Sequence, residues 1–333
     1  MGITVIGSLN YDLVTYTDKV PDGGETIRAN SFETHTGGKG CNQCIAIARL
    51  KNPQDNYTVR MVGSVGNDAF GAQLLDTLRR DGVDVDQVKV LEGVSTGTAT
   101  ILVEEKLGGQ NRILIVKGAN GESKYSSQQL KDMFKETKEK EYVVFQQEIP
   151  NADCVMKWIH DNISNSVIVF NPSPFQPIAK AHWNAVDVLV VNEIEALQVI
   201  EDAEGPEKVK EYKEMINDNF ISTYKNIAIR LKSQYVNPEG KRAVIITLGS
   251  KGVLYVSKQN PEVGYMDAIH DVKVVDSTGA GDTFLGALVT QLYEGKPLSE
   301  AIKFATFSSS LAIQKNGAAE SIPKHNDVKA VLS

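Results

Sequence analysis

Short runs of β-branched residues recur along this chain, and each is followed by a longer segment whose apolar residues have helical spacing. These runs have the composition of strands that are buried on both faces. Such strands are typical of parallel sheets, because the crossover helices that join them cover both sides. The pattern therefore predicts an α/β fold with a doubly wound, mostly parallel central sheet flanked by helices. The predicted strands are 4–6, 59–62, 142–145, 167–170, 188–191 and 244–247.

Two segments depart from this alternation. Extended runs at 98–104 and 112–117 flank Gly108-Gly109 with no helical pattern between them, which indicates an antiparallel hairpin. We expect the segments at about 10–37 and 96–117 to form a small antiparallel β lid beside the main sheet.

The rest of the chain gives no sign of a second domain. Residues 201–242 are rich in Glu and Lys and have helical patterns, so we expect solvated helices over one face of the sheet. No repeat and no linker rich in Pro, Gly or Ser separates independent units. Residues 1–333 are therefore expected to form a single α/β domain that carries the lid.

Composition narrows the class of function. A hydrophobic fraction of 41% and a charged fraction of 23% are ordinary for a globular enzyme. The formal net charge of -7 argues against nucleic acid or an acidic membrane as a partner, because either would need an electropositive face. The sequence shows no apolar run of the roughly 20 residues that cross a bilayer and no secretory signal at its start. A cytoplasmic location is expected, and the sequence is silent on entry into the nucleus.

The segment 276–283, Asp-Ser-Thr-Gly-Ala-Gly-Asp-Thr, carries the most chemistry. Its small residues lead into a helical pattern, and the first amides of a helix lack internal partners and lie at the positive end of its dipole. A phosphate group is expected to approach the backbone of Gly279, Ala280 and Gly281. Asp282 beside this anion hole fits a general base for a hydroxyl, although a carboxylate there also serves as a helix cap. The segment matches neither a P-loop nor a dinucleotide fingerprint.

A second glycine cluster, Gly37-Gly38-Lys39-Gly40, precedes another strongly helical run. Asn10 and Asp12 follow the first predicted strand. Amide and carboxylate groups of this kind can hydrogen-bond several hydroxyls of one small ligand. Together these residues predict a sugar-binding site.

The three cysteines are expected to be free thiols. Cys41 and Cys44 form a Cys-x-x-Cys pair at a helix start, where thiolates are acidified and a redox role must be weighed. Packing of Cys44 as a small buried hydrophobe is the stronger interpretation. A zinc site would need further ligands, and the sequence offers Cys154 only the distant His160.

In their order along the chain, these motifs resemble those of the ribokinase-like, or phosphofructokinase-B, carbohydrate kinases, and the resemblance covers essentially the whole sequence. Residues 37–43 look like the first family signature and 276–282 like the second, which is more specific. Asn10-Tyr11-Asp12 and the lysine in the glycine cluster are similar to members that phosphorylate ribose rather than adenosine or fructose. The resemblance implies ATP-dependent phosphorylation of D-ribose at its 5-hydroxyl to give D-ribose 5-phosphate and ADP, with Asp282 as the base.

The resemblance also assigns roles to positions that carry little signal alone. The implied sugar contacts are Asn10, Asp12, Gly38, Lys39, Gly40, Asn42, Glu148 and Asp282. The implied ATP contacts are Asn192, Thr247, Gly249, Ser250, Gly252, Gly281 and Thr306. Glu195 matches a position of the magnesium shell, and the implied potassium site comprises Asp276, Thr278, Ala312, Lys315, Gly317 and Ser321. Without the resemblance, Asn192 and Glu195 would pass for a helix cap and an exposed acid.

In this family the lid closes over the sugar and often pairs between subunits, which implies exclusion of water and a homodimer. Other functions stay open from the residues alone. They are a kinase for deoxyribose, adenosine or fructose, a non-catalytic sugar-binding regulator, and a nicotinamide-dependent oxidoreductase. The intact Asp282 argues against a silent regulator, and the missing dinucleotide fingerprint argues against the oxidoreductase.

Overall fold

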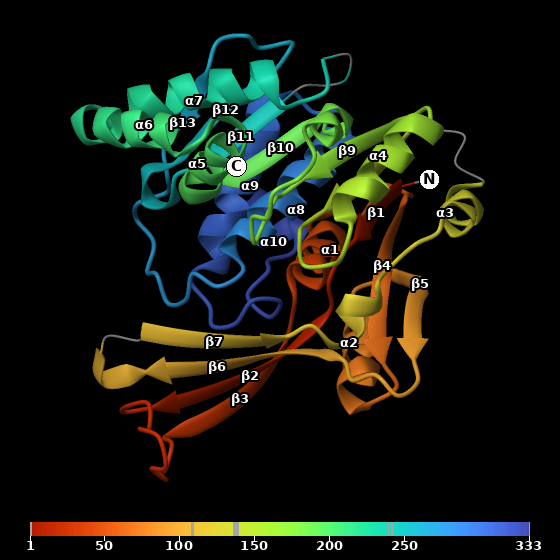
Figure 1. Ribbon diagram of the computed structural model, residues 1–333, viewed down its shortest axis with the longest axis vertical. Helices are drawn as coiled ribbons and strands as arrows, with labels where there is room; N and C mark the ends of the chain where they lie inside the picture. The colour runs from red at the N-terminus through yellow and green to blue at the C-terminus, as the bar shows by residue number, and fades with distance from the viewer. Residues whose placement is uncertain (1, 108–109, 136–139, 239, 241–242, 333) are drawn as a thin grey trace.

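The computed structural model describes residues 2–107, 110–135, 140–238, 240 and 243–332, and these form a large sheet and a small one (Figure 1). The large sheet has the strand order β13-β12-β11-β10-β9-β8-β1-β4-β5. Neighbours from β11 to β5 pair in parallel, and β12 and β13 are antiparallel additions at one edge. Its strands are β1 (Gly2–Ile6), β4 (Thr58–Gly66), β5 (Asp84–Leu91), β8 (Glu141–Phe145), β9 (Ser166–Phe170), β10 (Val188–Asn192), β11 (Ala243–Thr247), β12 (Val253–Val256) and β13 (Gly264–Met266).

Side chains alternate between two hydrophobic cores, one on each face of the large sheet. In β8, Tyr142 and Val144 belong to one core while Val143 and Phe145 belong to the other. Both sets are fully buried, which explains why this strand reads as a continuous apolar run. The predicted mostly parallel, doubly wound sheet is confirmed.

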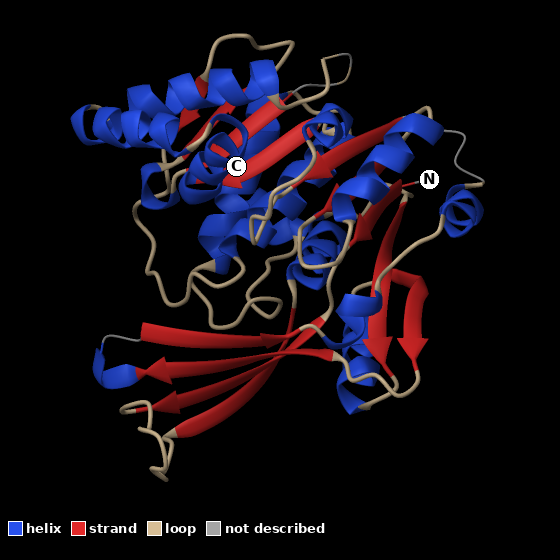
Figure 2. Ribbon diagram, in the orientation of Figure 1, coloured by secondary structure: helices blue, strands red, loops and turns tan. Residues whose placement is uncertain are grey.

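Helices cover both faces of this sheet (Figure 2). On one face lie α1 (Lys39–Leu50), α2 (Ala69–Arg80), α8 (Ala280–Tyr293), α9 (Leu298–Ala312) and α10 (His325–Leu332). On the other lie α3 (Ser127–Phe134), α4 (Ala152–Asn162), α5 (Glu193–Glu204), α6 (Pro206–Asp218) and α7 (Phe220–Gln234). Helices α6 and α7 bear out the solvated helices predicted within 201–242, since they bury Val209 and Ile227 but keep most of their charged side chains in solvent.

The direction of chain winding changes at β1. The chain runs outward from β1 through β4 to β5, and then returns to the other side of β1 with β8 and continues to β11. In an open α/β sheet, ligands bind outside the carboxyl ends of the strands at such a switch point. The carboxyl ends of β1 and β8 are therefore the place to look for a site.

The small sheet, termed the lid sheet, has the order β3-β2-β6-β7 and extends away from the main body (Figure 1). Its strands are β2 (Asn10–Thr17), β3 (Ser31–Gly37), β6 (Gly97–Glu104) and β7 (Gln110–Val116). The predicted antiparallel pairing holds for β2–β3 and β6–β7, but β2 and β6 pair in parallel from Asn10↔Gly97 to Thr17↔Glu104. The prediction of a wholly antiparallel lid is therefore wrong. A local hairpin signal cannot reveal how two distant hairpins pair with each other. The predicted turn at Gly108-Gly109 lies outside the described residues.

The first predicted strand, β1, is not followed by a helix as the alternating pattern of strands and helices suggested. The chain passes from β1 directly into β2 of the lid sheet, and the first helix, α1, begins only after β3. Because β1 lies at the switch point, this places the base of the lid sheet beside the expected site. Among the described helices, none has the length and apolar character required to span a membrane.

Candidate active site

Polar side chains gather where the parallel strands end. Ser8 follows β1, Gln146 follows β8 and Asn171 follows β9, while Asn192 is the last residue of β10. The carboxyl ends of parallel strands meet at one edge of a sheet, so residues far apart in sequence converge there. The starts of α1 and α8 meet the same edge, where Asn42 and Gln43 of α1 bond to Asp282 of α8.

Asp282 lies in the first turn of α8 and is buried. Its Oδ2 accepts a hydrogen bond from Asn42 Nδ2 at 3.2 Å, and its Oδ1 accepts one from Gln43 Nε2 at 2.9 Å. Two neutral side-chain amides therefore orient the carboxylate, and neither is an acid that would protonate it. Helix α8 is capped by Gly279, whose side chain cannot serve as a cap, so Asp282 is not the N-cap residue.

The amide of Gln43 is itself held in a buried network. Its Nε2 also donates to Asn171 Oδ1 at 3.2 Å, and its Oε1 accepts from Gln146 Nε2 at 2.6 Å. Sequence reasoning missed Gln43 as a partner of Asp282 and missed Asn171 and Gln146 entirely, because a lone amide after a strand carries no pattern. Asn42 Oδ1, in contrast, is buried and accepts no hydrogen bond from the described residues, so it can receive one from a ligand hydroxyl.

The start of α8 presents backbone amides beside Asp282. Gly279 has φ 74, a left-handed conformation that favours glycine, and a Cβ there would lie 3.0 Å from Ala318 Cα. The Ala280 amide donates to Ser277 O at a long 3.3 Å. The amides of Gly281 and Asp282 have no acceptor among the described residues, as expected for a helix start. These amides have the geometry of an anion hole next to a carboxylate.

The start of α1 packs against the end of β1 on the other side of Asp282. Gly38 has φ 86, and a Cβ at this residue would lie 2.7 Å from the backbone nitrogen of Asn10. The Glu148 carboxylate accepts a hydrogen bond from the Lys39 amide at 2.9 Å and a short one from the Ser8 hydroxyl. Glu148 is therefore a fixed, partly buried acceptor rather than a solvated loop residue.

The predicted sugar residues of β2 lie at the base of the lid sheet. Asn10 Oδ1 accepts a hydrogen bond at 2.7 Å from Asn120, a buried residue that sequence reasoning missed. Burial and the nearby Glu148 carboxylate raise the pKa of Asp12 to about 6, although His35 on the adjacent strand opposes the shift. Asp12 is thus a carboxylate that gains its charge only near neutral pH.

Lys39 connects the acidic groups of the site. Burial lowers the pKa of its ammonium group, but the carboxylates of Asp282, Glu148 and Glu195 outweigh this effect and the net shift is upward. Lys39 therefore stays protonated at neutral pH and supplies positive charge to this group of carboxylates.

A pocket of about 590 Å³ opens beside the start of α8, at the ends of β10 and β11. All seven residues predicted to contact ATP line it: Asn192, Thr247, Gly249, Ser250, Gly252, Gly281 and Thr306. The Thr306 hydroxyl is already bonded to Ile302 O at 2.9 Å, so this residue presents mainly its methyl group. Sequence reasoning missed the apolar wall made by Val272, Val274 and Ile313, since such residues in loops and helix ends carry no distinctive motif.

Asn192 and Glu195 form a capping box at the start of α5. Asn192 Oδ1 accepts from the Glu195 amide at 2.8 Å, and Glu195 Oε2 accepts from the Asn192 amide at 3.0 Å. The interpretation of a helix cap is therefore correct for this pair, but Glu195 is buried rather than exposed. Its Oε1 accepts no hydrogen bond from the described residues and remains available to a cation.

The residues of the implied potassium site are brought together in two adjacent segments. Asp276 Oδ1 accepts from the Thr278 hydroxyl at 2.7 Å, and Asp276 Oδ2 accepts from the Gly317 amide at 3.0 Å. Burial acts to raise the pKa of Asp276, but these hydrogen bonds outweigh it and lower the pKa. The Lys315 amide donates to Ala312 O, and the buried Ser321 donates its hydroxyl to Ala318 O at 2.8 Å. An ionised carboxylate among backbone carbonyls suits a hard cation.

Known proteins are similar to this chain in both sequence and fold. The chain matches the pfkB family of carbohydrate kinases over residues 2–325. It is 39% identical over 327 residues to a ribokinase of Schizosaccharomyces pombe, with 97% of this chain and 95% of that protein covered. The crystal structure of a ribokinase from Thermotoga maritima matches 99% of both chains with a TM-score of 0.81 and 30% identity. A ribokinase of Arabidopsis thaliana, solved with ribose and ATP, matches 100% of this chain and 98% of its own with a TM-score of 0.81 and 28% identity. These similarities confirm the fold class and the family predicted from the sequence.

Proposed function

The chain belongs to the pfkB family of carbohydrate kinases, and we propose that it transfers the γ-phosphoryl group of ATP to the 5-hydroxyl of D-ribose. The products are D-ribose 5-phosphate and ADP. The single observation that carries this proposal is the position of Asp282. Amides from the sugar-side helix α1 hold its carboxylate, and its own helix α8 begins at the wall of the pocket formed at the ends of β10 and β11.

Ribose would lie between the base of the lid sheet and the start of α1. Asn10, Asp12 and Glu148 supply acceptors for its hydroxyls, and the unpartnered Asn42 Oδ1 supplies another. Gly38 and Gly40 let the start of α1, with Lys39, pack directly on the backbone of Ser8 and Asn10, which keeps these predicted contacts close to the proposed sugar site. The relative from Arabidopsis thaliana, which binds ribose and ATP, supports this placement at the level of the fold.

Phosphoryl transfer needs a base, groups that stabilise the negative charge of the transferring phosphoryl group, and in-line approach of the sugar hydroxyl. Asp282 takes the proton of the 5-hydroxyl as its oxygen bonds to the γ-phosphorus, and the bond from that phosphorus to the bridging oxygen of ADP breaks. Of the three amides predicted to form the anion hole, that of Ala280 already donates to Ser277 O, so those of Gly279 and Gly281, joined by the Asp282 amide, donate to the phosphoryl oxygens. The Lys39 ammonium offsets charge that develops beside them. Preorganised donors of this kind typically account for about 3 to 4 kcal/mol of barrier lowering each.

ATP would occupy the pocket at the ends of β10 and β11. The turn at Gly249, Ser250 and Gly252 brings backbone atoms to the wall of this pocket. An apolar surface for the adenine ring of ATP is provided by Val272, Val274 and Ile313. Asn192 lines the side nearest β10. With the anion hole at one end, this arrangement points the triphosphate toward Asp282.

Two cations fit the residues present. The free Oε1 of Glu195 and the anionic surroundings of Lys39 suit the shell of Mg²⁺, which when bound neutralises charge on the nucleotide phosphates. Asp276, Thr278 and the predicted positions Ala312, Lys315, Gly317 and Ser321, several of them through backbone carbonyls, would hold K⁺. Because Gly279 packs against Ala318, a cation between these segments would steady the start of α8 and its amides.

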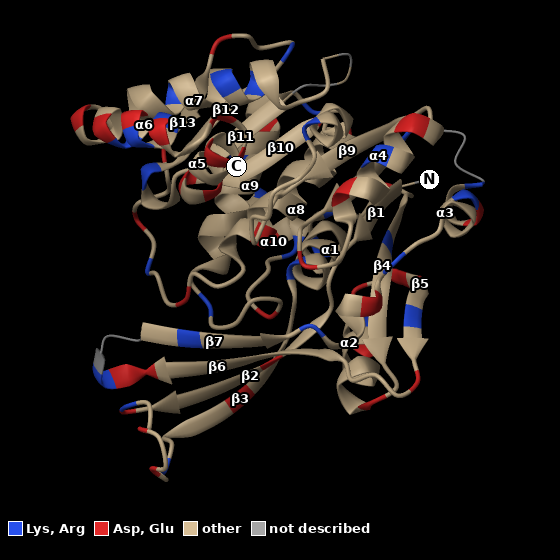
Figure 3. Ribbon diagram, viewed as in Figure 1, with Lys and Arg blue, Asp and Glu red and all other residues tan. Residues whose placement is uncertain are grey.

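The lid sheet supplies two further parts of the proposal. It closes over ribose and excludes water, which would otherwise accept the phosphoryl group. Its edge strand β7 exposes Ile113, Leu114, Ile115 and Val116 on both faces, and the lid strands carry few charged residues (Figure 3). An uncovered apolar edge of this kind is expected to pair with the lid of a second copy, giving a homodimer.

The test is ATP-dependent phosphorylation of ribose, 2-deoxyribose, fructose and adenosine, with K⁺ present or replaced by Na⁺. Ribose should give the highest kcat/KM, and K⁺ should raise turnover. A preference for another acceptor would overturn the ribose assignment while leaving a sugar or nucleoside kinase. Binding of ribose without any product would favour a non-catalytic regulator.

A further inference from the structure

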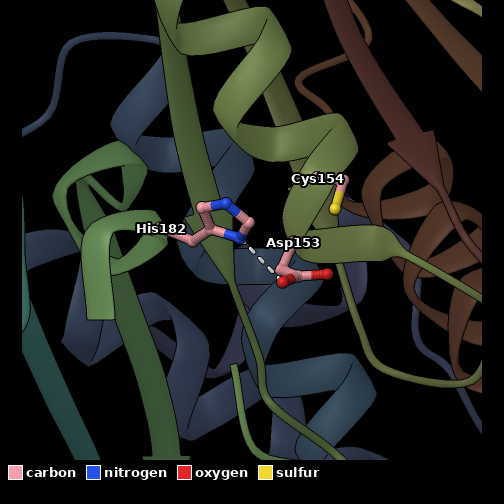
Figure 4. Close-up of side chains that lie close together, drawn as sticks. All are labelled: Asp153, Cys154 and His182. Atoms are coloured by element: carbon pink, nitrogen blue, oxygen red, sulfur yellow. Dashed lines mark hydrogen bonds and ion pairs between the residues drawn. The ribbon is translucent and has the colours of Figure 1, made fainter. Parts of the chain in front are cut away.

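A second group of reactive side chains lies outside the proposed active site, where α4 meets the short 3-10 helix η3 (Lys180–Ala185). Asp153 and Cys154 are in the first turn of α4, and His182 is in η3 (Figure 4). One donor atom from each residue lies within 4.8 Å of the other two. Asp153 Oδ2 and His182 Nδ1 already share a hydrogen bond of 2.7 Å.

We propose that Asp153, Cys154 and His182 form a binding site for a divalent transition-metal ion of the Zn²⁺ class. Carboxylate, thiolate and imidazole are the ligands that Zn²⁺ uses in proteins, and water from the solvent side would complete a tetrahedral shell. Ligand atoms about 2.0 to 2.3 Å from an ion in that shell lie roughly 3.3 to 3.8 Å apart. Cys154 is exposed and in no disulfide, so rotation of its side chain can bring the sulfur closer to the other two ligands.

The backbones that carry these ligands are fixed by the core. Trp183, next to His182, is buried and packs 5.9 Å, between ring centroids, from both Phe170 and Tyr235. Val155 and Met156 of α4 are buried in the same core. The ligands therefore sit on two elements that are packed into the same core, and a well-supported backbone is a condition for a specific metal site.

Binding must release a proton from the thiol. Burial and the Asp153 carboxylate raise the pKa of Cys154, so the metal-free residue is a thiol at neutral pH. The ion forms a bond to sulfur as the S–H bond breaks, and the proton leaves to solvent. The His182 imidazole coordinates through one ring nitrogen and keeps an N–H on the other.

The alternative is that the three side chains bind no metal and that the hydrogen bond between Asp153 and His182 only holds η3 against α4. Binding of Co²⁺ distinguishes this alternative from a metal site. Added to the whole protein at pH 7.5, Co²⁺ should give a near-ultraviolet thiolate-to-metal charge-transfer band that saturates at one ion per chain and is displaced by Zn²⁺. His160→Gln is the matched control, because His160 lies on the same helix outside the cluster.

The band should disappear in Cys154→Ser and in His182→Gln but persist in His160→Gln. Zn²⁺ should raise the Tm of the wild type and not that of Cys154→Ser, whose metal-free Tm serves as the check on folding. No band in the wild type, or a band that survives His182→Gln, would overturn the proposal. Neither outcome depends on kinase activity.

Discussion

Gln43 Nε2 donates to Asp282 Oδ1 at 2.9 Å, although 239 residues separate the two in the sequence. Gln43 is fully buried and is held in turn by Gln146. The carboxylate proposed as the catalytic base therefore depends on an amide that contacts neither proposed substrate. Loss of that amide should impair catalysis more than binding.

Gln43→Ala should lower kcat while changing the KM for ribose much less, because it frees the Asp282 carboxylate without removing a sugar contact. A hydrogen bond to a charged group contributes about 1.5 to 3 kcal/mol, which corresponds to roughly a 10- to 100-fold loss of kcat. Gln291→Ala is the matched control, since Gln291 is a buried amide on α8 that bonds to Glu294 at the far end of the helix. Equal losses of kcat in both variants would contradict a positioning role.

The raised pKa of Asp12 predicts how ribose use depends on pH. Its carboxylate has a pKa of about 6, so it loses its charge as the pH falls through that value. Because kcat/KM reports groups of the free enzyme, kcat/KM for ribose should fall about tenfold per pH unit below roughly 6. In Asp12→Asn the value should be low at all pH, and this acid limb should be missing. A limb that stays near 6 in the variant would assign it to another group.

Gly38 should tolerate no side chain. A Cβ would lie 2.7 Å from the Asn10 backbone nitrogen, and φ of 86 disfavours any other residue by about 1 to 2 kcal/mol. Gly38→Ala is expected to raise the KM for ribose by about tenfold or more. Gly295→Ala separates strain from contact, because Gly295 has φ 81 but a Cβ there would meet no heavy atom within 4 Å. That variant should lose stability in thermal unfolding and keep its KM.

The exposed edge of the lid predicts the oligomeric state. Leu114→Lys should convert the proposed homodimer to a monomer in light scattering, because a charge on β7 opposes pairing of apolar edges. Val90→Lys is the control, since Val90 is exposed on β5 at the edge of the large sheet. A wild type that is monomeric at micromolar concentration, or a Leu114→Lys variant that stays dimeric, would contradict pairing through β7.

The sequence was sufficient to predict features that depend on short segments of the chain. Continuous apolar runs, typical of strands buried on both faces, predicted the parallel sheet. The segment 276–283 predicted a helix start that carries a carboxylate. The resemblance added the predicted ATP contacts, and all seven of these residues line one pocket. The strands and the helix start depend on residues that are neighbours in the chain, whereas the predicted ATP contacts are spread over residues 192–306 and came from the resemblance alone.

Features that depend on distant residues were not predictable. The parallel pairing of β2 with β6 joins segments more than 80 residues apart, and no local pattern encodes it. Asn120 and Asn171 are single amides in ordinary surroundings, and only the fold brings them to Asn10 and Gln43. His182 likewise meets Asp153 through the packing of η3 on α4, whereas the sequence offered Cys154 only the distant His160, which argued against a zinc site.

The role of Asp282 as the base is best tested by comparing the wild type with Asp282→Asn at saturating ATP and ribose, with ribose binding followed by calorimetry. Asn keeps the shape of Asp but cannot take a proton. The variant should form ribose 5-phosphate roughly 100- to 10,000-fold more slowly, as for loss of a general base, and should still bind ribose within a few-fold of the wild type. Turnover within about threefold of the wild type would contradict Asp282 as the base.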